Sequence, residues 1–138
     1  MVGFNLLNPS ARTELLELTR ARGIGVLVMF AVRRSLSNGE ATAATIAELV
    51  DAGQVDPDMV SGDDPLGFLV RPGAASSVVD AAYRFARHEP GCDVVLTGTG
   101  NVAHLAENIA SITAGPLPAA DQQRLLRTFG NVDSVSGN

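Results

Sequence analysis

Lysine and tryptophan are absent from this chain of 138 residues, and all ten of its Lys or Arg positions are arginine. Without a lysine amine, the chain alone cannot form a Schiff base or use a lysine to tune a catalytic tyrosine. The single cysteine, Cys92, excludes an internal disulfide. It fits a reducing compartment, so we expect a cytoplasmic protein. Because Cys92 precedes an apolar run, the sequence favours a packing role for it over a nucleophilic one.

Long hydrophobic runs are also missing. No stretch approaches the roughly 20 apolar residues of a membrane span, and residues 1–12 show no signal peptide, so we expect no membrane partner. The net charge of −5 disfavours nucleic acid as a partner. With 46% hydrophobic and 18% charged residues, the chain has the composition of one modest globular domain.

Short apolar runs alternate with segments of helical period along the chain. Strands are predicted near 3–7, 25–30 and 93–97. Helices are predicted near 11–22, 41–52, 76–88, 102–112 and 119–129. This alternation indicates βαβ units and a parallel sheet. Three parallel strands cannot close a barrel, and their outer edges would be bare.

The segment 93–112 carries the clearest functional pattern. Its apolar strand ends at Gly98 and Gly100, and Asn101 then opens a helix with four apolar residues on one face, Val102, Leu105, Ile109 and Ile112. Glycines before a helix N-terminus are typical of an anion site, most often for phosphate, although an ordinary βα turn can need glycine too. The loose dinucleotide motif Gly98-x-Gly100-x-x-Ala103 is also present. The strand that would carry its later acidic residue is not.

The same segment resembles the last strand, loop and helix of the aldo/keto reductases, an NAD(P)(H)-dependent family built on a (β/α)8 barrel. The family motif is roughly K-S-x-x-x-x-R-[IL]-x-E-N, and here Gly98-Thr99 and four further residues precede 104–108 (HLAEN). Other segments resemble the family in the same order. They are 2–9 (VGFNLLNP, sixth strand), 23–36 (GIGVLVMFAVRRSL, seventh strand), 116–118 (PLP) and 129–130 (FG).

This resemblance implies an α/β fold: a partial (β/α)8 TIM barrel of about three βα units plus a C-terminal helix. A complete barrel needs about 250 residues. Residues 1–138 then form a single partial domain, similar to the cofactor-binding part of the family. The implied activity is carbonyl/alcohol interconversion with NADP or NAD as cofactor, on a small-molecule carbonyl substrate of the parent protein.

The resemblance assigns roles to five residues in or just before the predicted helix 102–112. Glu107 and Asn108 match the pair that contacts the adenine end, and Thr99 matches a serine that can donate to a phosphate. Gly98 and His104 stand where many members carry the lysine and the arginine that holds the 2′-phosphate. The preference between NADP and NAD therefore stays open. A solvated helix surface is the alternative interpretation of Glu107 and His104.

Three further candidates lie at the end of the second predicted strand or just after it. Phe30 is the candidate for the aromatic residue that stacks on the nicotinamide, unless Met29 holds that register or Phe30 belongs to the core. Arg33 or Arg34 can neutralise the pyrophosphate, unless both are solvated loop residues. The predicted cofactor-binding residues are thus Phe30, Arg33, Arg34, Gly98, Thr99, His104, Glu107 and Asn108. No metal ligand is predicted.

No catalytic residue is predicted. The family uses a tyrosine acid assisted by Lys, Asp and His from its amino-terminal half, whereas Tyr83 lies mid-helix on an apolar face. The alternative function is therefore a non-catalytic remnant, which binds nucleotide weakly or assembles with another half-barrel. That partner would be the missing N-terminal half or a second copy in a homo-oligomer.

Overall fold

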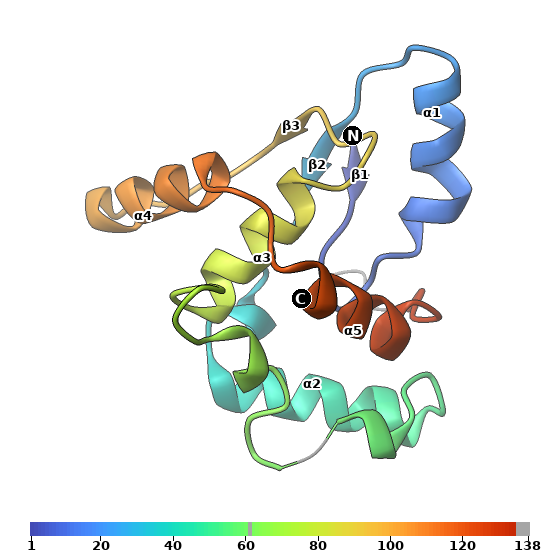
Figure 1. Ribbon diagram of the computed structural model, residues 1–138, viewed down its shortest axis with the longest axis vertical. Coiled ribbons are helices and arrows are strands. Elements are labelled where there is room, and N and C mark those ends of the chain that lie inside the picture. Colours follow the sequence, from blue (N-terminus) through green and yellow to red (C-terminus); the bar gives the residue numbers. More distant parts are fainter. Residues whose placement is uncertain (61, 135–138) are drawn as a thin grey trace.

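The computed structural model describes residues 1–60 and 62–134, which form five α-helices and a small parallel sheet (Figure 1). The sheet order is β1 (Val2–Gly3), β2 (Leu27–Met29) and β3 (Val94–Val95). Val28 pairs with Val2 on one side and with Val95 on the other, and both pairings are parallel. These observations confirm the predicted mixed α/β class and the parallel sheet. They also confirm that the second and third strands are neighbours.

Each strand is shorter than its predicted range. The first was expected over 3–7, but Asn5 bends the chain. Its Oδ1 accepts hydrogen bonds from the backbone N–H groups of Leu7 and Asn8, both at 2.9 Å. A side chain that bonds the backbone two residues further along favours a turn over extended pairing. Phe4, Leu6 and Leu7 are therefore buried in the core without belonging to a strand.

The helices lie close to their predicted ranges. They are α1 (Glu17–Ala21), α2 (Gly39–Asp51), α3 (Val78–Arg87), α4 (Val102–Thr113) and α5 (Ala119–Phe129). The first predicted helix begins instead as a π-helical stretch, Arg12–Leu16. Asn38, Ser77 and Asn101 cap α2, α3 and α4, because each side chain accepts from a first-turn N–H. Short 3₁₀ turns occupy Arg34–Leu36, Pro57–Met59 and Gly67–Leu69.

The core lies on the side of the sheet that α3 covers. There the Phe4 ring stacks on Phe85 of α3, with centroids 5.4 Å apart. Cys92 is buried among these residues, and burial, with the nearby Glu89 and Asp93 charges, raises the pKa of its thiol to about 12. Such a thiol stays protonated at neutral pH, which agrees with the expected packing role.

The opposite face of the sheet is apolar but open. Leu27, Val94 and Leu96 point to this side and are 39%, 47% and 39% exposed. Parallel sheets are normally covered on both faces, so this open face departs from the usual architecture.

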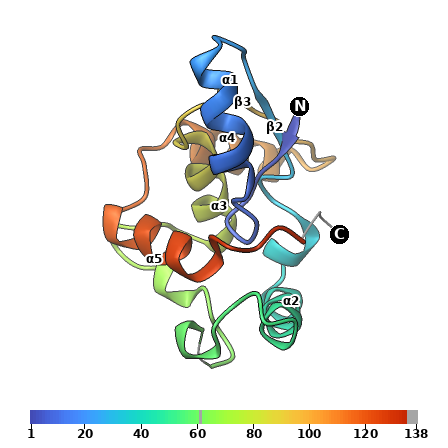
Figure 2. The ribbon, with the colours of Figure 1, turned by 90° about the vertical axis from the view of Figure 1, so that its right-hand side faces the viewer.

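The helices flank the sheet unevenly. α4 extends to one side and α1 lies on the other, while α2 lies at the opposite end of the molecule from α1 in both views (Figures 1 and 2). On α4 three residues of the predicted apolar stripe, Val102, Leu105 and Ile109, are exposed and Ile112 is partly buried, whereas Asn108 and Ser111 are buried. None of the helices in the described ranges is long and apolar enough to cross a membrane.

Candidate functional site

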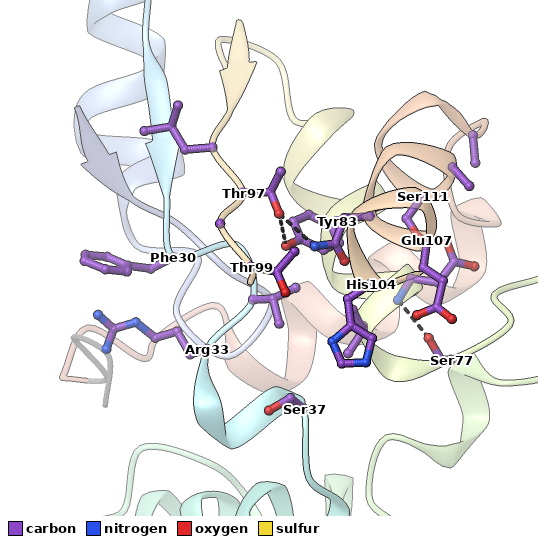
Figure 3. Close-up of a pocket in the computed structure, with 18 of the residues that line it drawn as sticks. Phe30, Arg33, Ser37, Ser77, Tyr83, Thr97, Thr99, His104, Glu107 and Ser111 are labelled. Carbon is purple, nitrogen blue, oxygen red and sulfur yellow. Dashed lines mark hydrogen bonds between the residues drawn. The ribbon is translucent and has the colours of Figure 1, made fainter. Parts of the chain in front are cut away.

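A cleft of about 1220 Å³ opens where β2 and β3 end, with α3 and α4 along its other side (Figure 3). In parallel α/β sheets, ligands bind beyond the carboxyl ends of the strands. Seven of the eight predicted cofactor-binding residues line this cleft: Phe30, Arg33, Gly98, Thr99, His104, Glu107 and Asn108. Arg34 does not line it; this residue is exposed at the start of the following 3₁₀ turn.

The end of β2 holds an uncommon backbone conformation. Phe30 has a φ of 68°, and it is the one non-glycine residue with positive φ in the described parts of the chain. A bulky L-residue rarely adopts this conformation, and such strain concentrates at functional sites. The Phe30 side chain is 42% exposed rather than part of the core. Met29, the alternative candidate for this position, also lines the cleft.

Arg33 packs against Phe30 and carries an unsatisfied charge. Its guanidinium carbon lies 3.9 Å from the centroid of the Phe30 ring, a cation–π contact. The Nε and Nη1 atoms are shielded from solvent and have no hydrogen-bond partner among residues 1–60 and 62–134. Burial lowers the pKa of this guanidinium below its usual value. These two shielded, unbonded donors favour an anionic ligand, because the anion would satisfy them.

The glycine turn after β3 is less specialised than its sequence indicates. Neither Gly98 nor Gly100 has positive φ, and a Cβ atom at either position would meet no atom within 4 Å. The backbone geometry therefore does not require glycine here. The Oγ1 of Thr99 accepts from the N–H of Asn101, whose own Oδ1 accepts from the N–H of Ala103. Two N–H groups at the start of α4 are thus already bonded within the chain, which leaves Arg33 as the stronger anion site.

The wall formed by α3 and α4 is held by one threonine. The Oγ1 of Thr97 accepts from Nδ2 of Asn108 at 2.8 Å and lies 2.8 Å from the hydroxyl of Tyr83 (Figure 3). Asn108, which was predicted to contact adenine, donates one of its two amide N–H groups to Thr97. Tyr83 is buried as predicted, but its hydroxyl reaches the cleft lining.

Thr97 was not among the predicted site residues. The signal available in the sequence was its place between an apolar run and a glycine turn, where the carboxyl end of a strand meets the cleft. A pattern of this kind does not identify the two partners of Thr97, the Tyr83 hydroxyl and the Asn108 amide. They come from two helices, α3 and α4, that only the fold brings together.

The far edge of the cleft is acidic and rich in hydroxyl groups. In Figure 3, Glu107, Ser111 and Ser77 lie on one side of Thr97 and Thr99, and Phe30 and Arg33 lie on the other side, with their side chains pointing away from the first three. Asp80 also lines this edge, and its Oδ2 accepts from the N–H and hydroxyl of Ser76. The cleft therefore has a cationic end and an acidic end.

No family model matches this chain, and a search of curated proteins finds no match. The resemblance to the aldo/keto reductases therefore stays a prediction from the sequence.

Proposed function

We propose that this chain binds a nicotinamide dinucleotide, NADP or NAD, in the cleft beyond β2 and β3. It would serve as the cofactor-binding part of an NAD(P)(H)-dependent oxidoreductase of aldo/keto reductase type, with its sheet as an arc of a (β/α)8 barrel. The proposal rests on one observation: the predicted cofactor-binding residues lie together. Residues chosen from the sequence in three separate segments, 30–33, 98–99 and 104–108, line one cleft at the carboxyl ends of parallel strands.

The β2 end of the cleft supplies the chemistry that the pyrophosphate and the nicotinamide require. The unsatisfied Nε and Nη1 donors of Arg33 suit phosphate oxygens, which accept strong charge-assisted hydrogen bonds. The Phe30 ring is partly exposed, so it can stack on a planar ring while Arg33 covers part of its surface. A phosphate group and a planar ring, close together, are shared features of both dinucleotides.

The chain alone should not reduce a carbonyl. It contains no lysine, and its one tyrosine, Tyr83, is buried with its hydroxyl bonded to Thr97. An assay of NADPH and NADH consumption with a panel of aldehydes should show no turnover above background. Turnover that Tyr83→Phe abolishes would contradict this assignment.

The binding proposal is tested by a matched pair of variants. Arg33 lines the cleft, whereas its neighbour Arg34 is exposed outside it, so both substitutions remove the same charge from the same loop. We expect Arg33→Leu to weaken NAD⁺ binding about tenfold to a hundredfold, because a charge-assisted bond contributes about 1.5–3 kcal/mol. Arg34→Leu should leave the affinity nearly unchanged. Equal effects of the two substitutions, measured by isothermal titration calorimetry, would reject Arg33 as the phosphate site.

The second candidate is assembly with a complementary half-barrel. The apolar, exposed sheet face at Leu27, Val94 and Leu96 favours it, because uncovered parallel sheets are unusual. If this face drives assembly, sedimentation velocity should show concentration-dependent association of the wild-type chain, and Val94→Lys should abolish it. A wild-type chain that stays monomeric at every concentration would reject self-assembly.

A further inference from the structure

The open face of the sheet carries an apolar strip of four uncharged side chains. Val28 of β2 is fully buried on the core side, so Leu27 and Met29 point to the open face, because side chains alternate along a strand. Val94 of β3 pairs with Leu27 in the parallel register, and Leu96, two residues further on, points to the same side. The strip therefore runs along β2 and β3 toward their carboxyl ends.

The ring of Phe30 extends this strip across β1. Gly3 pairs with Met29, so a side chain at Gly3 would also point to the open face. A Cβ atom built at Gly3 would lie 3.6 Å from Cδ2 of Phe30. The ring therefore lies over β1 on the open face, where Gly3 has no side chain to displace it, and 42% of its surface is exposed.

Arg33 lies at the end of the extended strip. Its guanidinium carbon is 3.9 Å from the centroid of the Phe30 ring, and it forms no ion pair in the part of the chain that the structure describes. Its Nε and Nη1 donors are shielded and unbonded, so an anion reaches them only if the exposed Phe30 ring shifts. A hydrocarbon surface that ends at such a cation is complementary to an alkyl chain with an anionic end.

We infer that the open face binds a long-chain carboxylate, with its alkyl chain along the apolar strip and its carboxylate at Arg33. The strip offers no hydrogen-bonding side chain, so it suits a hydrocarbon chain and not a sugar or a base. The net charge of −5 opposes a second copy of the chain as the occupant. This inference does not rest on the proposed function, although a dinucleotide and a carboxylate would compete for Arg33.

The first experiment is a calorimetric titration of the whole chain with octanoate and decanoate, each kept below the concentration at which it forms micelles. We expect decanoate to bind roughly fourfold to fifteenfold more tightly, the range for half to full burial of two further methylenes. Acetate has the same headgroup without the chain, and decyltrimethylammonium has the same chain with a cation. Neither should show saturable binding.

Two matched pairs of variants locate the carboxylate and the chain, with circular dichroism to verify that each variant folds. Arg33→Leu should weaken decanoate binding at least tenfold, whereas Arg34→Leu, which removes the same charge from an exposed neighbour, should leave it unchanged. Val94→Ser should weaken it about threefold, whereas Val102→Ser, at a residue of α4 that is 82% exposed and outside the strip, should not. Val94 does not line the cleft, so Val94→Ser should not change NAD⁺ affinity.

The outcomes separate this inference from the proposed function. Decanoate binding that depends on chain length, Arg33 and Val94 supports the inference even if NAD⁺ does not bind. No saturable binding of decanoate overturns the inference even if NAD⁺ binds. Equal effects of Arg33→Leu and Arg34→Leu would overturn the assignment of the carboxylate to Arg33. Association with anionic phospholipid vesicles, without binding of monomeric decanoate, would assign the face to a membrane surface and overturn the inference.

Discussion

The two walls of the cleft differ in how well their polar groups are satisfied. On the α3–α4 wall, Tyr83 and Asn108 each form a hydrogen bond to Thr97 at 2.8 Å. On the β2 wall, Phe30 holds a strained backbone, and two donors of Arg33 have no partner in the described chain. The polar groups of the α3–α4 wall therefore satisfy one another, whereas the β2 wall has donors that a ligand can satisfy.

This difference teaches where to look for function. Groups that already satisfy each other stabilise the fold and gain little from a ligand. A strained residue beside an unsatisfied cation costs stability in the free protein, and binding of an anion recovers part of that cost. Substitutions on the α3–α4 wall should therefore change stability, and substitutions on the β2 wall should change affinity.

The largest effect on stability is expected at Thr97. Thr97→Val keeps the shape of the side chain but leaves the Tyr83 hydroxyl and the Asn108 amide without their shared partner. Leaving such groups unsatisfied costs about 1–3 kcal/mol, which urea denaturation followed by circular dichroism would measure. Thr99→Val is the control: its exposed hydroxyl accepts from the N–H of Asn101, which water can bond instead, so its cost should stay below about 0.5 kcal/mol. Equal losses of unfolding free energy in Thr97→Val and Thr99→Val would show that the Thr97 hydrogen bonds contribute no special stability.

A smaller effect of opposite sign is expected at Phe30. Phe30→Gly relieves the positive φ, whereas Phe30→Ala removes the same ring and keeps the strain. Because a left-handed conformation costs a non-glycine residue about 1–2 kcal/mol, the glycine variant should be more stable than the alanine variant by about 1 kcal/mol after the entropic cost of glycine. The difference between their unfolding free energies tests the strain directly. An alanine variant at least as stable as the glycine variant would mean that Phe30 is not strained.

The smallest effect lies away from both walls, at Glu89. Burial raises the pKa of this carboxyl above its usual value, although Arg12, whose Nε lies 2.9 Å from Oε1, lowers it in part. The folded state therefore binds the proton more tightly than the unfolded state does. The stability contributed by the protonated form is present below the ordinary carboxyl pKa of about 4.3 and is lost as pH rises through the raised value.

The Glu89 prediction is measured as a difference between two proteins. The unfolding free energy of the wild type, relative to Glu89→Gln, should fall as pH rises from about 4. NAD⁺ affinity should be the same in both proteins, since Glu89 does not line the cleft. A relative stability that rises with pH would reverse the assigned direction of the pKa shift.

Much of the fold was predictable from sequence because its elements follow local signals. The run before Gly98 predicted β3, and the helix expected to open at Asn101 does so, with the Asn101 side chain capping α4. The sequence did not predict which face of α4 is buried, because its apolar stripe has the pattern of a helix face that packs in a core. In the structure α4 packs on α3, Asn108 and Ser111 are buried, and Val102, Leu105 and Ile109 of the stripe remain exposed.

The candidate site was predictable in its position but not in its internal contacts. Phe30 and Arg33 follow one strand and Gly98 follows the neighbouring one, so a parallel sheet brings them together. The hydrogen bonds of Asn108 and Tyr83 to Thr97 depend on how α3 and α4 lie on the sheet. No local pattern encodes that arrangement.

The central claim, that a dinucleotide occupies this cleft, is tested most directly by NMR. NAD⁺ would be titrated into the ¹⁵N-labelled protein while the backbone amide shifts are followed. The account predicts saturable shifts at Phe30, Arg33, Gly98 and Glu107, with little change in α2. Shifts that centre on α2, around Ile46 and Val50, or no saturable shifts at millimolar NAD⁺, would contradict it.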